Sequence, residues 1–269
     1  LHNFPVLLNE TLTSHKQVIQ VWDSEGEVIE GLTSQRKKTI KAYVNITYGC
    51  NNFCSYCIVP YTRGRERSRE VDDILDEIKQ LVANGTKEVM LLGQNVNSYG
   101  KNLETPDEFA ELIEKVNEIE GLERIRFMTS HPKDISPRLL EVMAKGDKIC
   151  EYLHLPIQSG SNTILHRMNR KYTREQYLET IQYARKLMPE IGLSTDIILG
   201  FPGETEADFN DTVDIIRTVN YDSAFTYLYS IRTGTPAATY ENQVNEDTKH
   251  ERMTRLLEVL NPGIEKKLT

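Results

Sequence analysis

The strongest constraint on the fold is a regular alternation of strand-like and helix-like segments along most of the chain. Six runs rich in β-branched, aromatic and aliphatic residues begin about 36 residues apart on average. That spacing fits one strand plus one helix, and consecutive βα units require a parallel sheet. The six runs are residues 42–47, 88–92, 125–128, 152–155, 193–199 and 224–229.

Six βα units predict an α/β fold of one of two kinds. One is an open, doubly wound sheet and the other is an incomplete (β/α)6 barrel of the TIM type; the periodicity does not choose between them. In both architectures ligands bind at the carboxyl ends of the strands. No Gly-rich phosphate fingerprint follows the first strand, which counts against a dinucleotide-binding fold.

The segments between the strand-like runs have the periodicity and the starting residues of helices. Residues 71–82 place Val, Ile and Leu at positions i, i+3, i+4 and i+7, which forms one apolar face. Residues 246–260 carry apolar residues at similar intervals and predict a last helix on the outside of the sheet. Capping signatures begin further helices at Thr105, Ser136, Thr173 and Thr205.

The texture of the sequence changes near residue 41. Residues 1–40 hold short, scattered patterns and no core element, so we expect a linker there. We expect one α/β domain over residues 41–240 and a C-terminal helix over residues 241–269.

Charge and hydropathy exclude several classes of protein. The 32 Lys and Arg against 40 Asp and Glu give a net charge of −8, which argues weakly against a free-standing nucleic-acid module, although local basic patches override such a balance. No stretch approaches the roughly 18 consecutive apolar residues of a membrane helix. Residues 1–5 also lack the basic end and apolar stretch of a signal peptide. We therefore expect a cytoplasmic protein without membrane contact.

Three of the four cysteines, Cys50, Cys54 and Cys57, fall within eight residues directly after the first strand. Such crowding does not resemble a disulfide framework and indicates metal or redox chemistry. Zinc needs a fourth ligand, and Cys150, three strands away, is better explained as a small core residue. A [4Fe–4S] cluster held by only three cysteines leaves one iron open to a small chelating ligand. We therefore favour iron–sulfur over structural zinc or three inert thiols.

The C-x3-C-x2-C loop, with Tyr56 before its last cysteine, resembles the radical S-adenosylmethionine (SAM) superfamily. Its continuation through residues 58–66 is similar to the methylthiotransferases of that superfamily. Residues 93–97 resemble the MiaB group, which modifies isopentenyladenosine beside the tRNA anticodon. The resemblance covers roughly residues 36–260 and implies an incomplete (β/α)6 barrel. Supporting stretches are residues 92–100, 129–132, 155–161, 168–172 and 195–204.

The resemblance implies that Cys50, Cys54 and Cys57 hold a [4Fe–4S] cluster whose fourth iron is chelated by SAM. One electron then cleaves SAM to methionine and a deoxyadenosyl radical, so no side chain is assigned a catalytic role. A polar residue inside an apolar strand, as at position 196, needs a partner, which a ribose or substrate contact would provide. The side chains expected to contact SAM are Tyr56, Gln94, Ser130, Gln158, Arg170 and Asp196. The alternatives are loop packing for Tyr56, solvent exposure for Gln94 and Arg170, and a purely structural hydrogen bond for Asp196.

Basic residues form two groups near the cysteine loop. Arg63, Arg65 and Arg67, with Arg69, alternate just after it, and residues 36–41 hold a second group. Solvated charged faces are the ordinary explanation. Beside an RNA-modifying site we favour phosphate contacts instead.

The family carries two domains that we do not find here: an N-terminal domain with a second cluster, and an RNA-binding TRAM domain. We therefore expect the 269 residues to be a central fragment that binds one cluster and cleaves SAM but does not insert sulfur. The implied partners are a tRNA anticodon stem–loop and an electron donor such as flavodoxin. The alternatives are action on a ribosomal protein or on threonylcarbamoyl-adenosine, or a non-enzymatic, zinc-stabilised RNA-binding module.

Overall fold

Six parallel strands follow one another around a partial barrel in the computed structural model, which describes residues 3–20, 28, 30, 40–103 and 109–268. The first sheet has the order β1–β4–β5 and the second the order β6–β7–β8. A parallel bridge between Ile125 and Ile149 continues the pairing from β5 towards β6. Each strand therefore lies beside the next in sequence, as in an incomplete (β/α)6 barrel, and the open doubly wound order is excluded. The strands are β1 (Lys41–Asn45), β4 (Glu88–Leu92), β5 (Arg124–Phe127), β6 (Tyr152–His154), β7 (Gly192–Leu199) and β8 (Ser223–Leu228).

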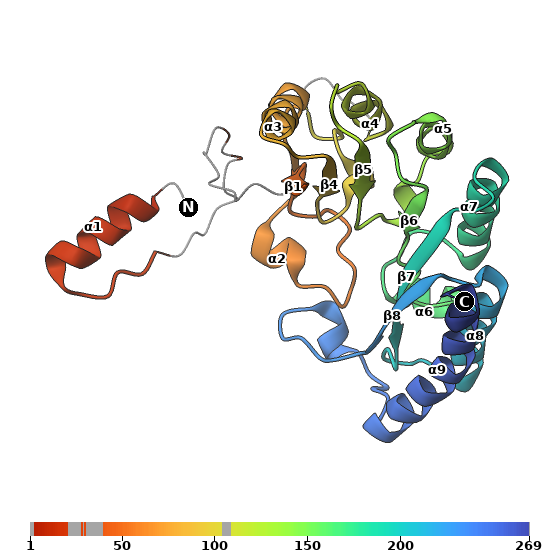
Figure 1. Cartoon of the computed structure of the whole chain (residues 1–269). Helices are drawn as coiled ribbons and strands as arrows, with labels where there is room; N and C mark the ends of the chain where they lie inside the picture. Colours follow the sequence, from red (N-terminus) through yellow and green to blue (C-terminus); the bar gives the residue numbers. More distant parts are fainter. Residues whose placement is uncertain (1–2, 21–27, 29, 31–39, 104–108, 269) are drawn as a thin grey trace.

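Helices cover the outer side of the curved sheet (Figure 1). The predicted N-caps at Ser136, Thr173 and Thr205 are confirmed, because each hydroxyl accepts a backbone N–H in the first turn of its helix. The signature at Thr105 lies outside the described residues. These helices are α3 (Val71–Ala83), α4 (Phe109–Asn117), α5 (Pro137–Lys145), α7 (Arg174–Leu187), α8 (Glu206–Val219) and α9 (Glu246–Leu268).

The main hydrophobic core lies between the strands and these helices. Alternate strand residues such as Val44, Leu91 and Ile125 are completely buried on that side. The intervening residues, such as Tyr43, which is 56% exposed, and Arg126, face the interior of the barrel. The barrel interior therefore keeps polar and exposed side chains that are available to a ligand.

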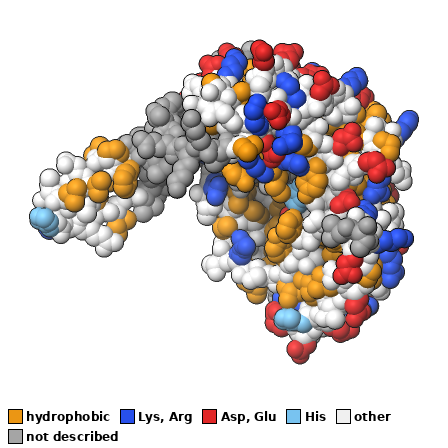
Figure 2. All heavy atoms as spheres, viewed as in Figure 1, with side chains coloured by type: hydrophobic (Ala, Val, Ile, Leu, Met, Phe, Trp, Pro, Cys, Tyr) orange, Lys and Arg blue, Asp and Glu red, His pale blue; other side chains and the backbone are white. Residues whose placement is uncertain are grey.

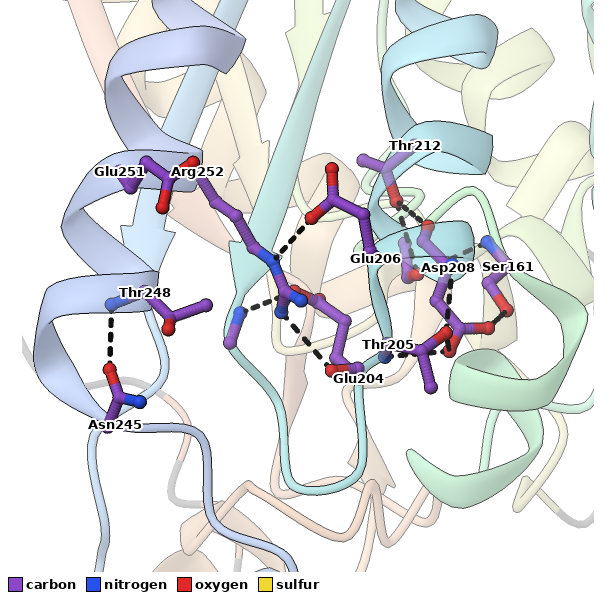
Figure 3. Close-up of polar contacts among 12 residues, drawn as sticks. Ser161, Glu204, Thr205, Glu206, Asp208, Thr212, Asn245, Thr248, Glu251 and Arg252 are labelled. Carbon is purple, nitrogen blue, oxygen red and sulfur yellow. Dashed lines mark hydrogen bonds and ion pairs between the residues drawn. The ribbon is translucent and has the colours of Figure 1, made fainter.

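Helix α9 is fixed to the turn after β7 by a buried ion pair (Figure 3). Arg252 Nη1 lies 2.8 Å from Glu204 Oε1, and the two side chains are 6% and 1% exposed. The same Glu204 oxygen accepts the backbone N–H of Gly200, and Arg252 also lies near Glu206. The predicted last helix is thus confirmed, and it runs beyond residue 260 with Pro262 inside it.

Short elements add to the barrel and were not predicted. The ribbon β2–β3 pairs Thr47 with Ser68 and Tyr48 with Arg67, just after β1. Figure 2 shows hydrophobic side chains on α1, which has no buried residue and so adds nothing to the core. These elements are α1 (Phe4–Ser14), β2 (Thr47–Tyr48), α2 (Val59–Arg63), β3 (Arg67–Ser68), α6 (Asn162–Arg167) and the 3-10 turns Val96–Ser98, Pro132–Asp134 and Pro236–Thr239.

No helix among the described residues is both long enough and apolar enough to cross a membrane.

Candidate functional site

The cysteine loop joins β2 to α2 and is tied to residues far away in the chain. Ser55 donates its backbone N–H to Met168 O at 3.0 Å and its hydroxyl to Arg167 O at 2.8 Å. Its own carbonyl accepts the N–H of Ala237 at 2.9 Å. Asn169 Nδ2 donates to Phe53 O at 2.8 Å. The end of α6 and the turn at 236–239 therefore fix the shape of the loop.

The backbone at the start of the loop needs a glycine. Gly49 has φ +72°, and a Cβ there would lie 2.0 Å from the carbonyl oxygen of Arg65. Gly49 thus lets the loop pass against the segment that leads into β3, and Cys50 N–H donates to Gly64 O at 3.2 Å.

The three loop cysteines are free thiols in a largely buried setting. Burial raises the pKa of the Cys50 thiol to about 11 and also raises that of Cys57. Cys54 lies next to a cation, because Arg170 Nη1 is 3.4 Å from its Sγ. Among the described residues, no three His, Cys, Asp or Glu side chains already converge on one metal position. The loop therefore offers three sulfur ligands and an adjacent positive charge, and this chemistry fits a metal–sulfur group. The three sulfur atoms do not yet converge on one metal position.

Cys150 is half-buried at the approach to β6 rather than in the core, which corrects that expectation. Its N–H donates to Ile125 O at 3.0 Å. The residue is part of the β5–β6 junction and belongs to a different part of the barrel from the loop.

Arg170 is held in one position by its neighbours. Its Nε donates to Tyr172 Oη at 3.0 Å and its Nη2 to Pro156 O at 2.8 Å, besides the contact with Cys54. The side chain is 7% exposed, so the solvated arginine that sequence left open is excluded. All three guanidinium nitrogens already have protein partners. Arg170 therefore links the loop to the end of β6, and this role is better supported than the expected bidentate contact with the SAM carboxylate.

Two predicted residues carry buried polar atoms without a partner. Ser130 Oγ after β5 and Gln158 Oε1 after β6 form no hydrogen bond with any described residue. Both residues are less than 10% exposed, and such atoms cost free energy unless a ligand or water satisfies them. Gln158 also has φ +71°, while its main chain still pairs with β7. This arrangement fits a ligand at the carboxyl ends of the strands.

Asp196 finds a protein partner that sequence did not identify. Its Oδ1 lies 3.6 Å from His154 Nε2, and the other ring nitrogen of His154 is 2.8 Å from Ser194 Oγ. His154 on β6 and Phe225 on β8 flank Asp196 on the interior side of the barrel. Its side chain remains 25% exposed and thus accessible.

Tyr56 lies half-buried in a small second cluster. Its ring meets Phe201 edge-on at 6.5 Å and packs near Ile164 and Met168. Burial raises the pKa of Tyr56, so the phenol is neutral at ordinary pH. The loop-packing role is therefore present in the structure.

The alternating arginines separate into different environments. Arg63 and Arg67 line a cavity of about 530 Å³ together with Gln94. Arg65 instead lies over the ring of Phe53, at 4.5 Å. Arg69 is buried and ion-paired with Glu30 and Glu77, which corrects its expected role as an exposed phosphate contact.

For the second basic group, the prediction of phosphate contacts near the cysteine loop is wrong for Lys41. Lys41 lies at the amino-terminal end of β1, where it pairs with Glu88, so it is at the opposite end of the strand from the cysteine loop. Residues 36–38 lie outside the described residues.

A buried group of polar residues beside the ends of β4 and β5 was not predicted from the sequence. Ser98 Oγ donates to Glu66 Oε2 at 2.5 Å, and Asn95 Nδ2 donates to Asp134 Oδ2 at 2.7 Å. Burial raises the pKa of Glu66. Thr129 has φ +66°, which is unusual for a β-branched residue, and its hydroxyl donates to Gly93 O at 2.6 Å. The sequence feature that could have indicated this group is the run of polar residues at 95, 97 and 98, within the stretch 92–100 that resembles the family.

Comparison with curated proteins finds near relatives over almost the whole chain. The tRNA-2-methylthio-N(6)-dimethylallyladenosine synthase of Clostridioides difficile (strain 630) is 62% identical over 97% of this chain and 55% of its own length. The protein of the same name from Alkaliphilus oremlandii (strain OhILAs) is 59% identical with the same coverage. The chain thus spans about half the length of the curated relatives it matches.

Solved structures with the same fold include two radical SAM enzymes. The methyltransferase TsrM of Kitasatospora setae matches with a TM-score of 0.61 and 17% identity, over 74% of this chain and 38% of that one. Coproporphyrinogen III oxidase (HemN) of Escherichia coli matches with a TM-score of 0.59 and 17% identity, over 85% and 54%. The sequence profile of the radical SAM superfamily matches residues 44–216. Since that match covers more than half of the chain, this protein belongs to the radical SAM superfamily.

Proposed function

We propose that this chain is the radical-generating part of a tRNA methylthiotransferase that adds a methylthio group to isopentenyladenosine next to the anticodon. The observation that carries the proposal is the cysteine loop, clamped by distant residues at the carboxyl ends of the strands with Arg170 against Cys54. The names of relatives that are about 60% identical support this substrate class.

Cys50, Cys54 and Cys57 are the proposed ligands of a [4Fe–4S] cluster. When bound, the cluster supplies the electron that cleaves SAM to methionine and a deoxyadenosyl radical. The chain itself fixes the loop through Ser55 and Asn169. The guanidinium of Arg170 lies 3.4 Å from Cys54 Sγ and so holds this end of the loop against the end of β6.

The proposed SAM contacts lie around this loop and at the strand ends. Gln158 Oε1 and Ser130 Oγ, both buried and without a described partner, are satisfied by polar groups of SAM. Asp196, still 25% exposed, accepts a ribose hydroxyl. The remaining proposed contacts are the ring of Tyr56, the amide of Gln94 and the guanidinium of Arg170.

The proposed partners of the protein are RNA and an electron donor. Arg63, Arg65 and Arg67 bind RNA phosphates, and residues 41–240 form the radical SAM domain, with a linker before it and a helix after it. The electron donor is a protein such as flavodoxin and the location is the cytoplasm. In this proposal the 269 residues carry SAM binding and radical generation.

The test is reductive cleavage of added SAM by the purified chain, with a strong reductant such as dithionite, after anaerobic reconstitution with iron and sulfide. We expect methionine and 5′-deoxyadenosine with the wild-type chain, and neither product with Cys54→Ala. A colourless protein with one zinc per chain and no cleavage contradicts the proposal and supports a zinc-stabilised RNA-binding module.

The nature of the substrate is tested with the whole protein. Nucleoside mass spectrometry of tRNA from a strain lacking the gene should show loss of the methylthio group on isopentenyladenosine. Loss on threonylcarbamoyl-adenosine, or on a ribosomal protein, would assign a different methylthiotransferase activity.

A further inference from the structure

A polar cavity of about 530 Å³ lies between the β2–β3 ribbon, the last turn of α2 and the carboxyl ends of β1 and β4. None of the described residues that line it is acidic, while two are arginines. A cavity with two guanidinium groups and no carboxylate favours an anion. Six of the lining residues are Asn45, Thr47, Arg63, Arg67, Gly93 and Gln94.

Thr47 is the strongest sign that this cavity takes a ligand. The residue is 3% exposed, and its Oγ1 has no hydrogen-bond partner among the described residues. A buried hydroxyl without a partner is unfavourable, so a ligand oxygen or hydroxyl at this point would stabilise the site. The space beside it depends on Gly93, where a Cβ would lie 2.3 Å from Thr47 Oγ1.

The two arginines are brought to the same opening by separate elements. Arg63 is exposed in the last turn of α2, and Arg67 is on β3, opposite Tyr48. Arg67 Nη2 donates to Arg63 O at 3.1 Å, which keeps the Arg67 side chain against the end of α2. Two adjacent guanidinium groups suit a phosphate, whose oxygens accept several N–H donors at once.

The size of the cavity favours more than a free anion. Its volume falls within the range of roughly 300–1,000 Å³ that is typical of small-molecule sites. A phosphate with its attached sugar fills such a space better than phosphate alone. A hydroxyl on that sugar can meet the Thr47 hydroxyl, and the amides of Asn45 and Gln94 add further donors and acceptors.

We propose that this cavity binds one nucleotide unit of the RNA backbone, with the phosphate on Arg63 and Arg67 and the ribose hydroxyl against Thr47. The inference rests on the proposed function, because that function makes RNA the substrate. It goes further by naming one site for that RNA at the rim of the barrel.

The experiment measures binding of a fluorescent anticodon stem–loop to the purified chain, without added metal, as a function of salt. Arg63→Ala and Arg67→Ala should each weaken binding about tenfold and each reduce the slope of log K against log salt. Because the two arginines share one phosphate, the double variant should reduce the slope by about 0.7–0.9 in total. Thr47→Val should weaken binding a few-fold without changing the slope, and should not lower the melting temperature, because it removes an unpartnered buried hydroxyl. Arg217→Ala, an exposed arginine on the outer face of α8, is the matched control and should bind as wild type.

Unchanged RNA affinity and salt slope in both arginine variants would overturn the inference. A loss of SAM affinity in the same variants, with RNA affinity retained, would assign the cavity to SAM and also overturn it. Competition by inorganic phosphate as strong as by the RNA would show a free-phosphate site, which contradicts an RNA site. Failure of SAM cleavage bears on the proposed function alone, because the RNA measurement needs neither cluster nor SAM.

Discussion

Replacing Arg252 by methionine should destabilise the fold strongly, because it leaves a buried carboxylate without its cation. The Arg252 and Glu204 side chains are 6% and 1% exposed and meet at 2.8 Å. Methionine keeps most of the apolar stem of the side chain, so the loss is mainly the charge and its hydrogen bonds. Removing one partner of such a pair costs about 3–5 kcal/mol. A loss of that size lowers the melting temperature by roughly 10 °C for a chain of this length.

The cost should depend on pH. Burial already raises the pKa of Glu204 above its value in the unfolded chain, and loss of Arg252 should raise it further. The folded variant then binds a proton more tightly than the unfolded chain, so lowering the pH stabilises the folded state. We therefore expect the difference between wild type and Arg252→Met to be largest at neutral pH and to shrink as the pH falls through the pKa of Glu204.

Urea denaturation at neutral and mildly acidic pH measures this directly. The control is Lys79→Ala, which removes an ion pair with Asp76 in which both side chains are at least 60% exposed and which should cost less than about 0.5 kcal/mol. The double variant Glu204→Gln/Arg252→Met should recover part of the loss, since no unpaired charge remains. Equal losses of stability for Arg252→Met and Lys79→Ala, or a loss for Arg252→Met that grows on acidification, would show that Arg252 does not neutralise a buried Glu204 carboxylate.

Two further predictions concern residues that position the site. Asn169 has φ +59°, and its side chain donates a hydrogen bond to Phe53 O. Asn169→Ala should lower the free energy of unfolding by about 2 kcal/mol and lower iron retention, whereas Asn169→Gly should restore about half of that stability. Equal losses of stability in the two variants would contradict this prediction. Arg69→Met should cost about 2–4 kcal/mol because Arg69 is buried against Glu30 and Glu77, and it should leave the salt slope of RNA binding unchanged. A reduced slope would show that Arg69 contacts phosphate after all.

The strands were predictable because alternate strand residues are buried under the helices, which requires runs of β-branched and aliphatic residues. The run 88–92 coincides with β4, and the run 193–199 differs from β7 by one residue. The short elements were not predictable, since five or six residues in α2 and α6 are too few to show helical periodicity. They form because tertiary contacts hold them, as Ser55 does at the end of α6.

The position of the site was predictable, and the environment of its residues was not. The arginines at 63, 65, 67 and 69 look alike in sequence, and only the fold brings Glu30, 39 residues away, to Arg69. Residues 168–172 were the one matching stretch that did not follow a strand. Contacts across 116 residues, from Asn169 to Phe53 and from Arg170 to Cys54, explain their place beside the loop.

The proposed function requires that three loop cysteines, and not the fourth, hold the cluster. Its most direct test is iron and sulfide analysis with visible absorption after anaerobic reconstitution of Cys50→Ala, Cys54→Ala, Cys57→Ala and Cys150→Ala. We predict about four iron atoms per chain for wild type and Cys150→Ala, and loss of iron and of the visible band in each loop variant. Full iron content in any loop variant, or its loss in Cys150→Ala alone, would rule out this set of cluster ligands.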